Sequence, residues 1–224
     1  YKQANRRFFV IRELEISEAI KNNDYDIAIK VLLESKELDA GNSEQLGKYS
    51  RQLIELYHKS GKTEEYIEEL IRYVTSFWQY DLTYVKMLKA CIVNSDQWGK
   101  MVDDIVKKSR YDDFVCKLLY EEKRYPELMS KIEQSSNKVS LLDSYDRGLR
   151  KTMPERVIKI YSDYVKQAAE MANDRNKYKS LMPYLKKITK CDGGKAVADD
   201  IAATWRREYK RRTAMMDELR KAGF

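Results

Sequence analysis

Apolar side chains recur along this chain at spacings of three to four and seven to eight residues. Five stretches with this pattern each begin at an aromatic residue: Tyr25, Tyr66, Trp98, Tyr125 and Tyr178. In the first stretch, Ile29 follows Tyr25 at +4, and Leu32 and Leu33 follow at +7 and +8. Because an α-helix completes a turn in about 3.6 residues, side chains at these spacings share one helical face. The pattern therefore predicts five amphipathic helices.

Polar residues and prolines mark where helices are expected to begin. Oxygen-bearing side chains that can accept bonds from the N–H groups of a first turn are Asp24, Thr63, Ser95, Asp96 and Asp174. Pro126 and Pro154 also favour helix starts, because the first N–H of a helix has no partner within it. Gly61 is expected to end one helix before Thr63 caps the next.

Five further segments between these stretches are expected to form partner helices, at about 2–21, 44–59, 81–93, 110–123 and 139–151. Another helix is expected from Pro154, because Val157, Tyr161 and Val165 would share one of its faces. The resulting helix pairs are roughly thirty to forty residues long, within the range of helical solenoids. One pair cannot bury its apolar stripe alone, so neighbouring pairs must stack.

The C-terminal part of the chain carries a basic run. Residues 174–190 are expected to form one helix, and Gly193 and Gly194 break the pattern after it. Residues 195–221 read as one long helix with Ile201, Trp205 and Leu219 on its apolar stripe. The basic residues expected on another face of it are Arg206, Arg207, Lys210 and Arg211. A large apolar ring at mid-stripe needs a partner surface, so Trp205 indicates that this helix caps the last repeat.

These elements predict an all-α fold, a right-handed α-solenoid of degenerate tetratricopeptide-like helix pairs. Residues 1–173 would form the helical-repeat region. Residues 174–224 would form a C-terminal helix pair with a basic capping helix in the same solenoid. The composition agrees, because eight Gly and three Pro are few for sheets or loop-rich folds.

The net charge of +7 comes from the C-terminal end of the chain. Residues 175–224 hold 14 Lys and Arg against 6 Asp and Glu, whereas the rest is nearly neutral. A basic end can attract nucleic acid, an acidic partner or a membrane surface. It can equally be a solvated face on which Glu208 pairs with Arg211 or Arg212. No apolar run is long enough to span a membrane, so no insertion is expected.

Residue types used in catalysis and metal binding are sparse. The single histidine, His58, has no local nucleophile or orienting carboxylate, and Cys91, Cys116 and Cys191 are far apart. Structural zinc needs pairs such as Cys-x-x-Cys, so no metal site is expected. We therefore predict no catalytic residue, no cofactor and no enzymatic activity; an enzyme with carboxylates in a deep pocket is the alternative. Three widely spaced cysteines also favour a reducing cytoplasm.

Four short segments near the C-terminus resemble the tail of bacterial SWIM zinc-finger proteins. They are Arg175-Asn176-Lys177-Tyr178, Leu185-Lys186-Lys187, the run from Trp205 to Arg212 and Met216-Asp217-Glu218-Leu219. The resemblance covers about 174–221 and implies tetratricopeptide-like repeats attached to a zinc-finger module. The Cys-x-Cys and Cys-x-His ligands of that module have no match in this sequence, so no zinc residue is implied. A chain that begins at Tyr1 is expected to be part of a longer protein.

Stacked helix pairs without catalytic groups favour a non-catalytic interaction module that binds a protein or peptide partner. A concave surface rich in tyrosine would hold a helix or an extended peptide. The alternative is nucleic-acid binding through the basic C-terminal helix. The residues that would contact phosphates are Arg206, Arg207, Lys210 and Arg211, with Lys186, Lys187 and Lys190 nearby.

Overall fold

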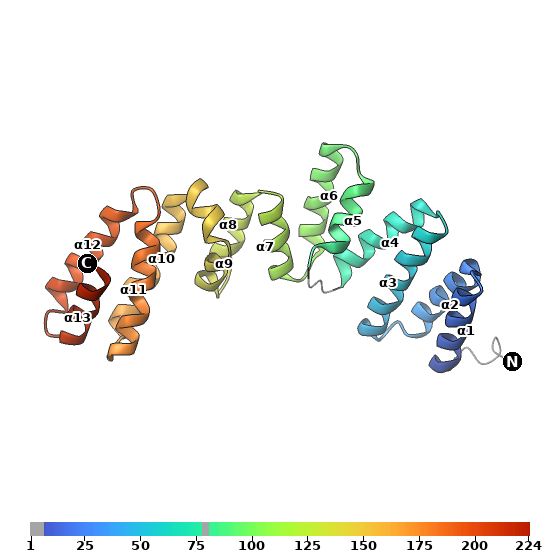
Figure 1. The fold of residues 1–224 in the computed structure, drawn as a ribbon, viewed down its shortest axis with the longest axis horizontal. Helices are drawn as coiled ribbons and strands as arrows, with labels where there is room; N and C mark the ends of the chain where they lie inside the picture. The colour runs from blue at the N-terminus through green and yellow to red at the C-terminus, as the bar shows by residue number, and fades with distance from the viewer. Residues whose placement is uncertain (1–6, 78–80) are drawn as a thin grey trace. The chain divides into compact units, whose positions relative to one another are not determined.

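A computed structural model describes residues 7–77 and 81–224, and these residues form thirteen helices and no strand (Figure 1). The predicted all-α class is therefore confirmed. The chain divides into two compact units, Tyr1–Val115 and Cys116–Phe224, and their boundary lies inside α7 (Asp112–Glu121). Among the described helices, none combines the length and the apolar character that crossing a membrane would require.

Unit 1 contains six helices before α7. They are α1 (Phe9–Lys21), α2 (Tyr25–Leu38), α3 (Ser43–Lys59), α4 (Thr63–Ser76), α5 (Thr83–Cys91) and α6 (Ser95–Lys108). From α1 to α5 each helix packs against the next one along the chain, and α4 also packs against α6. In α2 the spacing rule holds for Ile29 and Leu32, which are buried, but Leu33 is 41% exposed. Leu33 lies about a hundred degrees from Leu32 around the helix, at the edge of the buried stripe.

Unit 2 contains six helices after α7. They are α8 (Tyr125–Gln134), α9 (Lys138–Thr152), α10 (Pro154–Met171), α11 (Arg175–Thr189), α12 (Gly194–Glu208) and α13 (Thr213–Ala222). From α8 to α12 each helix packs against the next, and further contacts join α10 to α12 and α11 to α13. Packing in chain order buries each apolar stripe against sequence neighbours, as a helical repeat requires. The solenoid's handedness and its tetratricopeptide-like character stay predictions.

The predicted helices match the observed ones within a few residues. Those expected over 44–59, 81–93, 110–123 and 139–151 correspond to α3, α5, α7 and α9. The helix expected over 2–21 corresponds to α1, which begins at Phe9; residues 1–6 lie outside the described part of the chain. Helix α11 continues through Pro183 without a break.

The predicted helix starts are right at α11 and displaced at α6 and α4. At α11 the Asp174 carboxylate accepts a hydrogen bond from the backbone N–H of Lys177 at 2.9 Å. At α6 the cap is Asn94 rather than Ser95, because asparagine caps at least as well as serine and lies one residue earlier. At α4 the residue before the helix is Lys62, so Thr63 is its first helical residue rather than its cap.

The prediction of one helix over 195–221 is wrong. The segment forms α12 and α13 with a turn at 209–212 between them, so 174–224 holds three helices. The guanidinium of Arg212 turns inward, where Nη1 donates to the carbonyl oxygens of Ala169 at 2.7 Å and Ala172 at 3.1 Å. Carbonyls at a helix C-terminus lack partners within the helix and attract a cation. This contact with the end of α10 stabilises the turn where a continuous helix was expected.

Candidate functional site

A groove of about 460 Å³ lies in unit 2, where α9, α10 and α11 meet. Residues 136–140 at the start of α9 line one side, and Asp163, Tyr164 and Gln167 of α10 line the other, with Tyr184 of α11. Asp163 and Gln167 are four residues apart and share one side of that helix, whereas Tyr164 lies about a hundred degrees around it from Asp163. Because α9 and α11 both pack against α10, the groove gathers residues that are more than forty positions apart.

Asp143 of α9 joins the groove to the core beneath it. Its Oδ1 accepts a hydrogen bond from the Tyr161 hydroxyl at 2.7 Å and another from the Lys187 ammonium at 2.5 Å. Tyr161 is completely buried, and burial, followed by the hydrogen bond to Asp143, raises the pKa of its phenol. The phenol is therefore a neutral donor at ordinary pH. Asp143 and Lys187 each keep 29% of their side-chain surface exposed, so this ion pair reaches solvent.

Three tyrosine rings surround that ion pair. The rings of Tyr164 and Tyr184 have centroids 4.8 Å apart and meet nearly edge to face, and Tyr161 lies 5.8 Å from Tyr184. The Lys187 ammonium lies 4.8 Å from the Tyr184 ring centre and 5.5 Å from that of Tyr161. Burial, followed by the nearby Asp143 and Tyr164, raises the pKa of the Tyr184 phenol. The phenols of Tyr161 and Tyr184 thus stay neutral, and tyrosine ring faces can attract a cation.

The outer part of the groove is polar and open. Asp163 and Gln167 are exposed, and Asp163 has no hydrogen bond or ion pair within the described part of the chain. Gln167 offers both an amide donor and an acceptor of the kind that can bind a peptide backbone. This part of the groove therefore presents a carboxylate, an amide and a tyrosine face to a ligand.

Unit 1 contains a comparable cluster that is closed. The Asp39 carboxylate Oδ2 accepts a hydrogen bond from the Tyr49 hydroxyl at 2.6 Å and a short one from Arg12. Arg12 and Tyr49 are each only 1% exposed. The cluster uses the same three kinds of group as Asp143, Tyr161 and Lys187, but its cation is sealed from solvent.

A second groove, of about 510 Å³, lies in unit 1 beside the start of α4. His58 lines it and is exposed, with its ring 5.4 Å from that of Tyr66. Cys91 lines it too, and its thiol donates to the carbonyl oxygen of Met87 at 3.4 Å. No carboxylate is among the described residues that line this groove, so His58 lacks the orienting group of a catalytic dyad there.

The basic residues do not share one helical face, contrary to the prediction. Arg206 and Arg207 are exposed in the last turn of α12, whereas Lys210 and Arg211 are exposed in the turn that follows. Glu208 pairs with Arg207 at 3.6 Å instead of with Arg211 or Arg212. The four cations therefore lie around the end of α12, because the break at 209–212 changes the direction of the chain.

Other predicted basic residues have structural partners. Arg212 is bound to the end of α10, and its guanidinium lies 4.1 Å from the Tyr209 ring centre. Lys187 lies beside the groove and pairs with Asp143. Lys186 and Lys190 remain exposed on α11 and at its end. Lys187 is thus engaged by a carboxylate, unlike the exposed lysines on either side of it.

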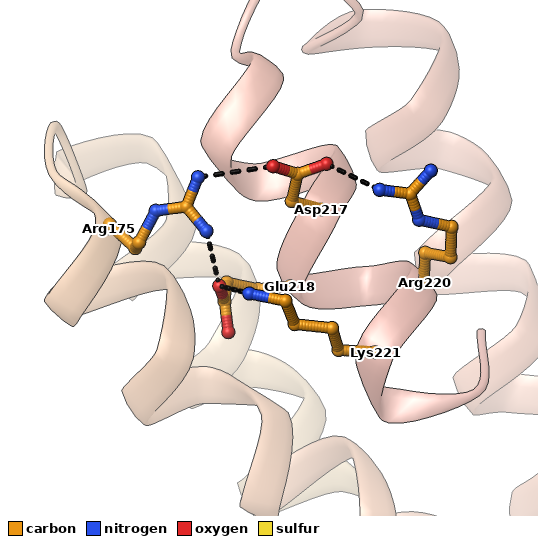
Figure 2. A network of polar contacts seen from close by, with 5 residues as sticks. All are labelled: Arg175, Asp217, Glu218, Arg220 and Lys221. Atoms are coloured by element: carbon orange, nitrogen blue, oxygen red, sulfur yellow. Dashed lines mark hydrogen bonds and ion pairs between the residues drawn. The ribbon is translucent and has the colours of Figure 1, made fainter.

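Ion pairs attach α13 to the first turn of α11 (Figure 2). Arg175 donates to Glu218 at 2.9 Å and to Asp217 at 3.1 Å. Arg220 and Lys221 approach the same two carboxylates, at 2.8 Å and 3.1 Å. The hydrogen bond from Lys221 contributes most to the lowered pKa of Glu218. The hydrogen bond from Arg175 contributes most to the lowered pKa of Asp217. The acidic residues of α13 therefore hold this helix in place.

The thiols and carboxylates do not converge on a metal site. Within residues 7–77 and 81–224, no group of three or more His, Cys, Asp or Glu side chains is arranged to hold an ion. Cys116 and Cys191 are buried, and burial, followed by the nearby Asp146, raises the pKa of Cys191 to about 11. A thiol with that pKa is a poor nucleophile at neutral pH, because the thiolate is the reactive form.

Sequence reasoning did not identify the groove residues as a site. Asp143, Asp163, Tyr164 and Tyr184 come from three helices and carry no motif. One signal was present in the sequence: Tyr164 places an aromatic ring next to the polar residues Asp163 and Gln167 of α10.

A scan of known protein-family models finds none that matches this chain, and no curated protein matches it either. The resemblance to the tail of SWIM zinc-finger proteins therefore stays a prediction.

Proposed function

We propose that this chain is a non-catalytic interaction module and that the groove between α9, α10 and α11 binds a segment of a protein partner. The observation that carries the proposal is the groove itself, in which tyrosine faces, an amide and a carboxylate surround about 460 Å³. Tyrosine is enriched at protein interfaces because its ring is apolar and its hydroxyl can bind water or a polar partner.

An extended peptide suits this groove. A volume of this size accommodates a few side chains, and groups on both sides can bind a backbone that passes between them. At the start of α9, Ser136, Asn137 and Ser140 are exposed and polar. Gln167 faces them from α10. Specificity would come from the side chain that enters between these two sides.

Selection of displayed random peptides on the whole chain tests this function. Ser140 is exposed and lines the groove, so Ser140→Trp would fill it without disturbing the core. Ser144 is also exposed on α9 but does not line the groove, so Ser144→Trp is the matched control. We expect Ser140→Trp to weaken the selected peptides at least tenfold and Ser144→Trp to change their Kd less than twofold. Peptides that bind Ser140→Trp as well as the parent chain would refute the proposal.

A second candidate function is nucleic-acid binding at the end of α12. Arg206, Arg207, Lys210 and Arg211 are all exposed there, and within the described part of the chain Glu208 alone forms an ion pair with one of them. Four phosphate contacts would give binding that weakens steeply as salt rises, with little dependence on base sequence. Arg212 follows the second pair directly and is bound to the end of α10, so Lys210 and Arg211 would be presented next to a fixed point of the chain.

Fluorescence anisotropy of labelled DNA and RNA, at low and physiological salt, tests this candidate. The four residues are replaced together by alanine. The matched control loses the same charge from exposed positions in unit 1: Lys30, Lys100, Lys107 and Arg110. Binding that is lost in the first variant and kept in the control would support a nucleic-acid surface. Equal losses would show that only net charge matters and would remove this candidate.

We also propose that the protein works in a reducing compartment such as the cytoplasm. The three cysteines all lie in the described part of the chain and form no disulfide, and two of them are buried in the helical core. Buried free thiols are usual where disulfides do not form.

A further inference from the structure

A cation of the protein itself lies beside the groove. The Lys187 ammonium lies against the Tyr184 and Tyr161 rings and pairs with Asp143, so ring faces and a carboxylate act on it together. Tyrosine faces attract cations because the ring carries negative charge above its plane. The contacts of Lys187 thus show that tyrosine rings and a carboxylate at this place in the fold bind a cation.

Asp163 and Tyr164 of α10 provide the groove with a second carboxylate and a further tyrosine ring. Tyr164 meets Tyr184 nearly edge to face, and Asp163 is the neighbour of Tyr164 on α10. Asp163 has no hydrogen bond or ion pair within the described residues, and its side chain is exposed. A carboxylate and a tyrosine ring that line the same groove are therefore available to a ligand.

The charges around the groove favour a cationic ligand. Asp143 is already neutralised by Lys187, which leaves the charge of Asp163. Lys138 is the only cation among the described residues that line the groove. Lys138 lies at the start of α9, on the side of the groove opposite α10. Asp163 therefore leaves the α10 side of the groove negative.

We propose that the groove binds its peptide through one basic side chain, a lysine or an arginine, that lies on the Tyr164 ring and pairs with Asp163. The inference rests on the proposed peptide-binding function and specifies its ligand. The whole chain carries a net charge of +7, so general electrostatic attraction would favour acidic peptides. A preference for a basic residue would therefore have to come from this local arrangement.

Retention of five nonapeptide mixtures on the immobilised whole chain tests the inference. Each mixture has one fixed central residue (Lys, Arg, Gln, Met or Glu), and its other positions are randomised over uncharged residues. We expect the Lys and Arg mixtures to be retained at least fivefold more than the Gln and Met mixtures. The Glu mixture should be retained least, because its carboxylate would face Asp163.

Two charge-matched variants locate the effect. Asp163→Asn should reduce retention of the Lys and Arg mixtures by about five- to tenfold and leave the Gln and Met mixtures unchanged. Asp199→Asn removes the same charge from an exposed position of α12, and we expect it to change none of the mixtures. Tyr164→Leu keeps an apolar contact with Tyr184 and should weaken the Lys and Arg mixtures about threefold.

The possible failures can be told apart. If all five mixtures are retained equally and Ser140→Trp abolishes the retention, the groove binds peptides but the basic anchor is refuted. The basic anchor is also refuted if Asp163→Asn and Asp199→Asn reduce retention of the Lys and Arg mixtures equally. If no mixture is retained, or if Ser140→Trp leaves retention unchanged, the proposed function itself fails and the inference fails with it.

Discussion

Each unit of this protein contains an aspartate held between a tyrosine hydroxyl and a cation, and the two clusters differ in their access to solvent. In unit 1 Asp39 binds Tyr49 and Arg12, whose side chain is 1% exposed. In unit 2 Asp143 binds Tyr161 and Lys187, whose side chain is 29% exposed and lies beside the groove.

The difference separates a structural role from a binding role. A guanidinium without access to water depends on its carboxylate, because an unpaired buried charge is costly. An ammonium that reaches solvent depends on its carboxylate much less. A tyrosine ring and a carboxylate beside the second cluster also line an open groove, whereas Tyr49 and Arg12 of the first are both buried. The same three groups can therefore stabilise one unit and shape a ligand site in the other.

Removal of the unit 1 carboxylate should have the largest effect. Asp39→Ala would take the carboxylate away from the buried Arg12 guanidinium, which should cost about 3–5 kcal/mol of local stability. Hydrogen exchange of peptides from α1 to α3 measures that stability directly. Replacement of both members by apolar residues, Arg12→Met with Asp39→Leu, should recover most of the loss. A loss below about 1 kcal/mol for Asp39→Ala would contradict the closed character of this cluster.

The corresponding change in unit 2 should cost less. Asp143→Ala would leave the buried Tyr161 hydroxyl without its acceptor, at about 1–3 kcal/mol, while Lys187 could turn to water. Hydrogen exchange of peptides from α9 to α11 measures this loss of local stability. Alkylation of Cys191 gives an independent check, since that thiol is buried with a pKa of about 11 and should react only when unit 2 opens. A loss as large as that of Asp39→Ala would break the comparison.

Removal of the hydroxyl groups should affect the two clusters equally. Tyr49→Phe and Tyr161→Phe each delete one buried donor and leave its aspartate paired with a cation. Each should cost about 1 kcal/mol. Urea unfolding followed by circular dichroism measures both variants on the same scale. Unequal losses would mean that the tyrosines, rather than the cations, distinguish the two clusters.

The ion pairs of Arg175 with α13 should have the smallest effect and provide a third case for the comparison, because Arg175 is 49% exposed and Glu218 also pairs with Lys221. Arg175→Ala should lower Tm by less than about 3 °C, and 1 M salt should remove most of the difference. A larger fall that is insensitive to salt would show that Arg175 contributes through packing instead.

The pH dependence of this attachment has a definite sign. The pKa values of Asp217 and Glu218 are lowered in the folded state by Arg175 and Lys221. Their contribution is therefore present above the unfolded carboxylate pKa of about 4 and is lost as pH falls through the folded values. Hydrogen exchange of α13 should accelerate relative to α10 across that range in the parent chain and much less in Arg175→Ala.

Much of the fold could be predicted from the sequence, because helical spacing is a local property. The break at 209–212 was missed, since neither glycine nor proline marks it. Its cause is a contact with α10, forty residues earlier, where Arg212 meets the Ala169 and Ala172 carbonyls. One signal was available: a stripe through Ile201 and Trp205 reaches Arg212 two turns later, where a continuous amphipathic helix would place an apolar residue.

The groove could not be predicted in the same way. Asp143, Tyr164 and Tyr184 become neighbours only because α9 and α11 both pack on α10. Their spacing along the chain carries no motif. The sequence places Lys187 in a basic run, and its partner Asp143 lies 44 residues away along the chain. The basic run was visible in the sequence, but its arrangement was not, because that depends on where α12 ends.

A double-mutant cycle between the groove and its ligand tests the central claim most directly. Isothermal titration would measure binding of a selected Lys-centred peptide, and of the same peptide with norleucine in place of lysine, to the parent chain and to Asp163→Asn. A basic anchor on Asp163 predicts a coupling energy of about 0.5–1.5 kcal/mol between the two changes. A coupling energy within about 0.3 kcal/mol of zero would contradict it, because independent sites add within that margin.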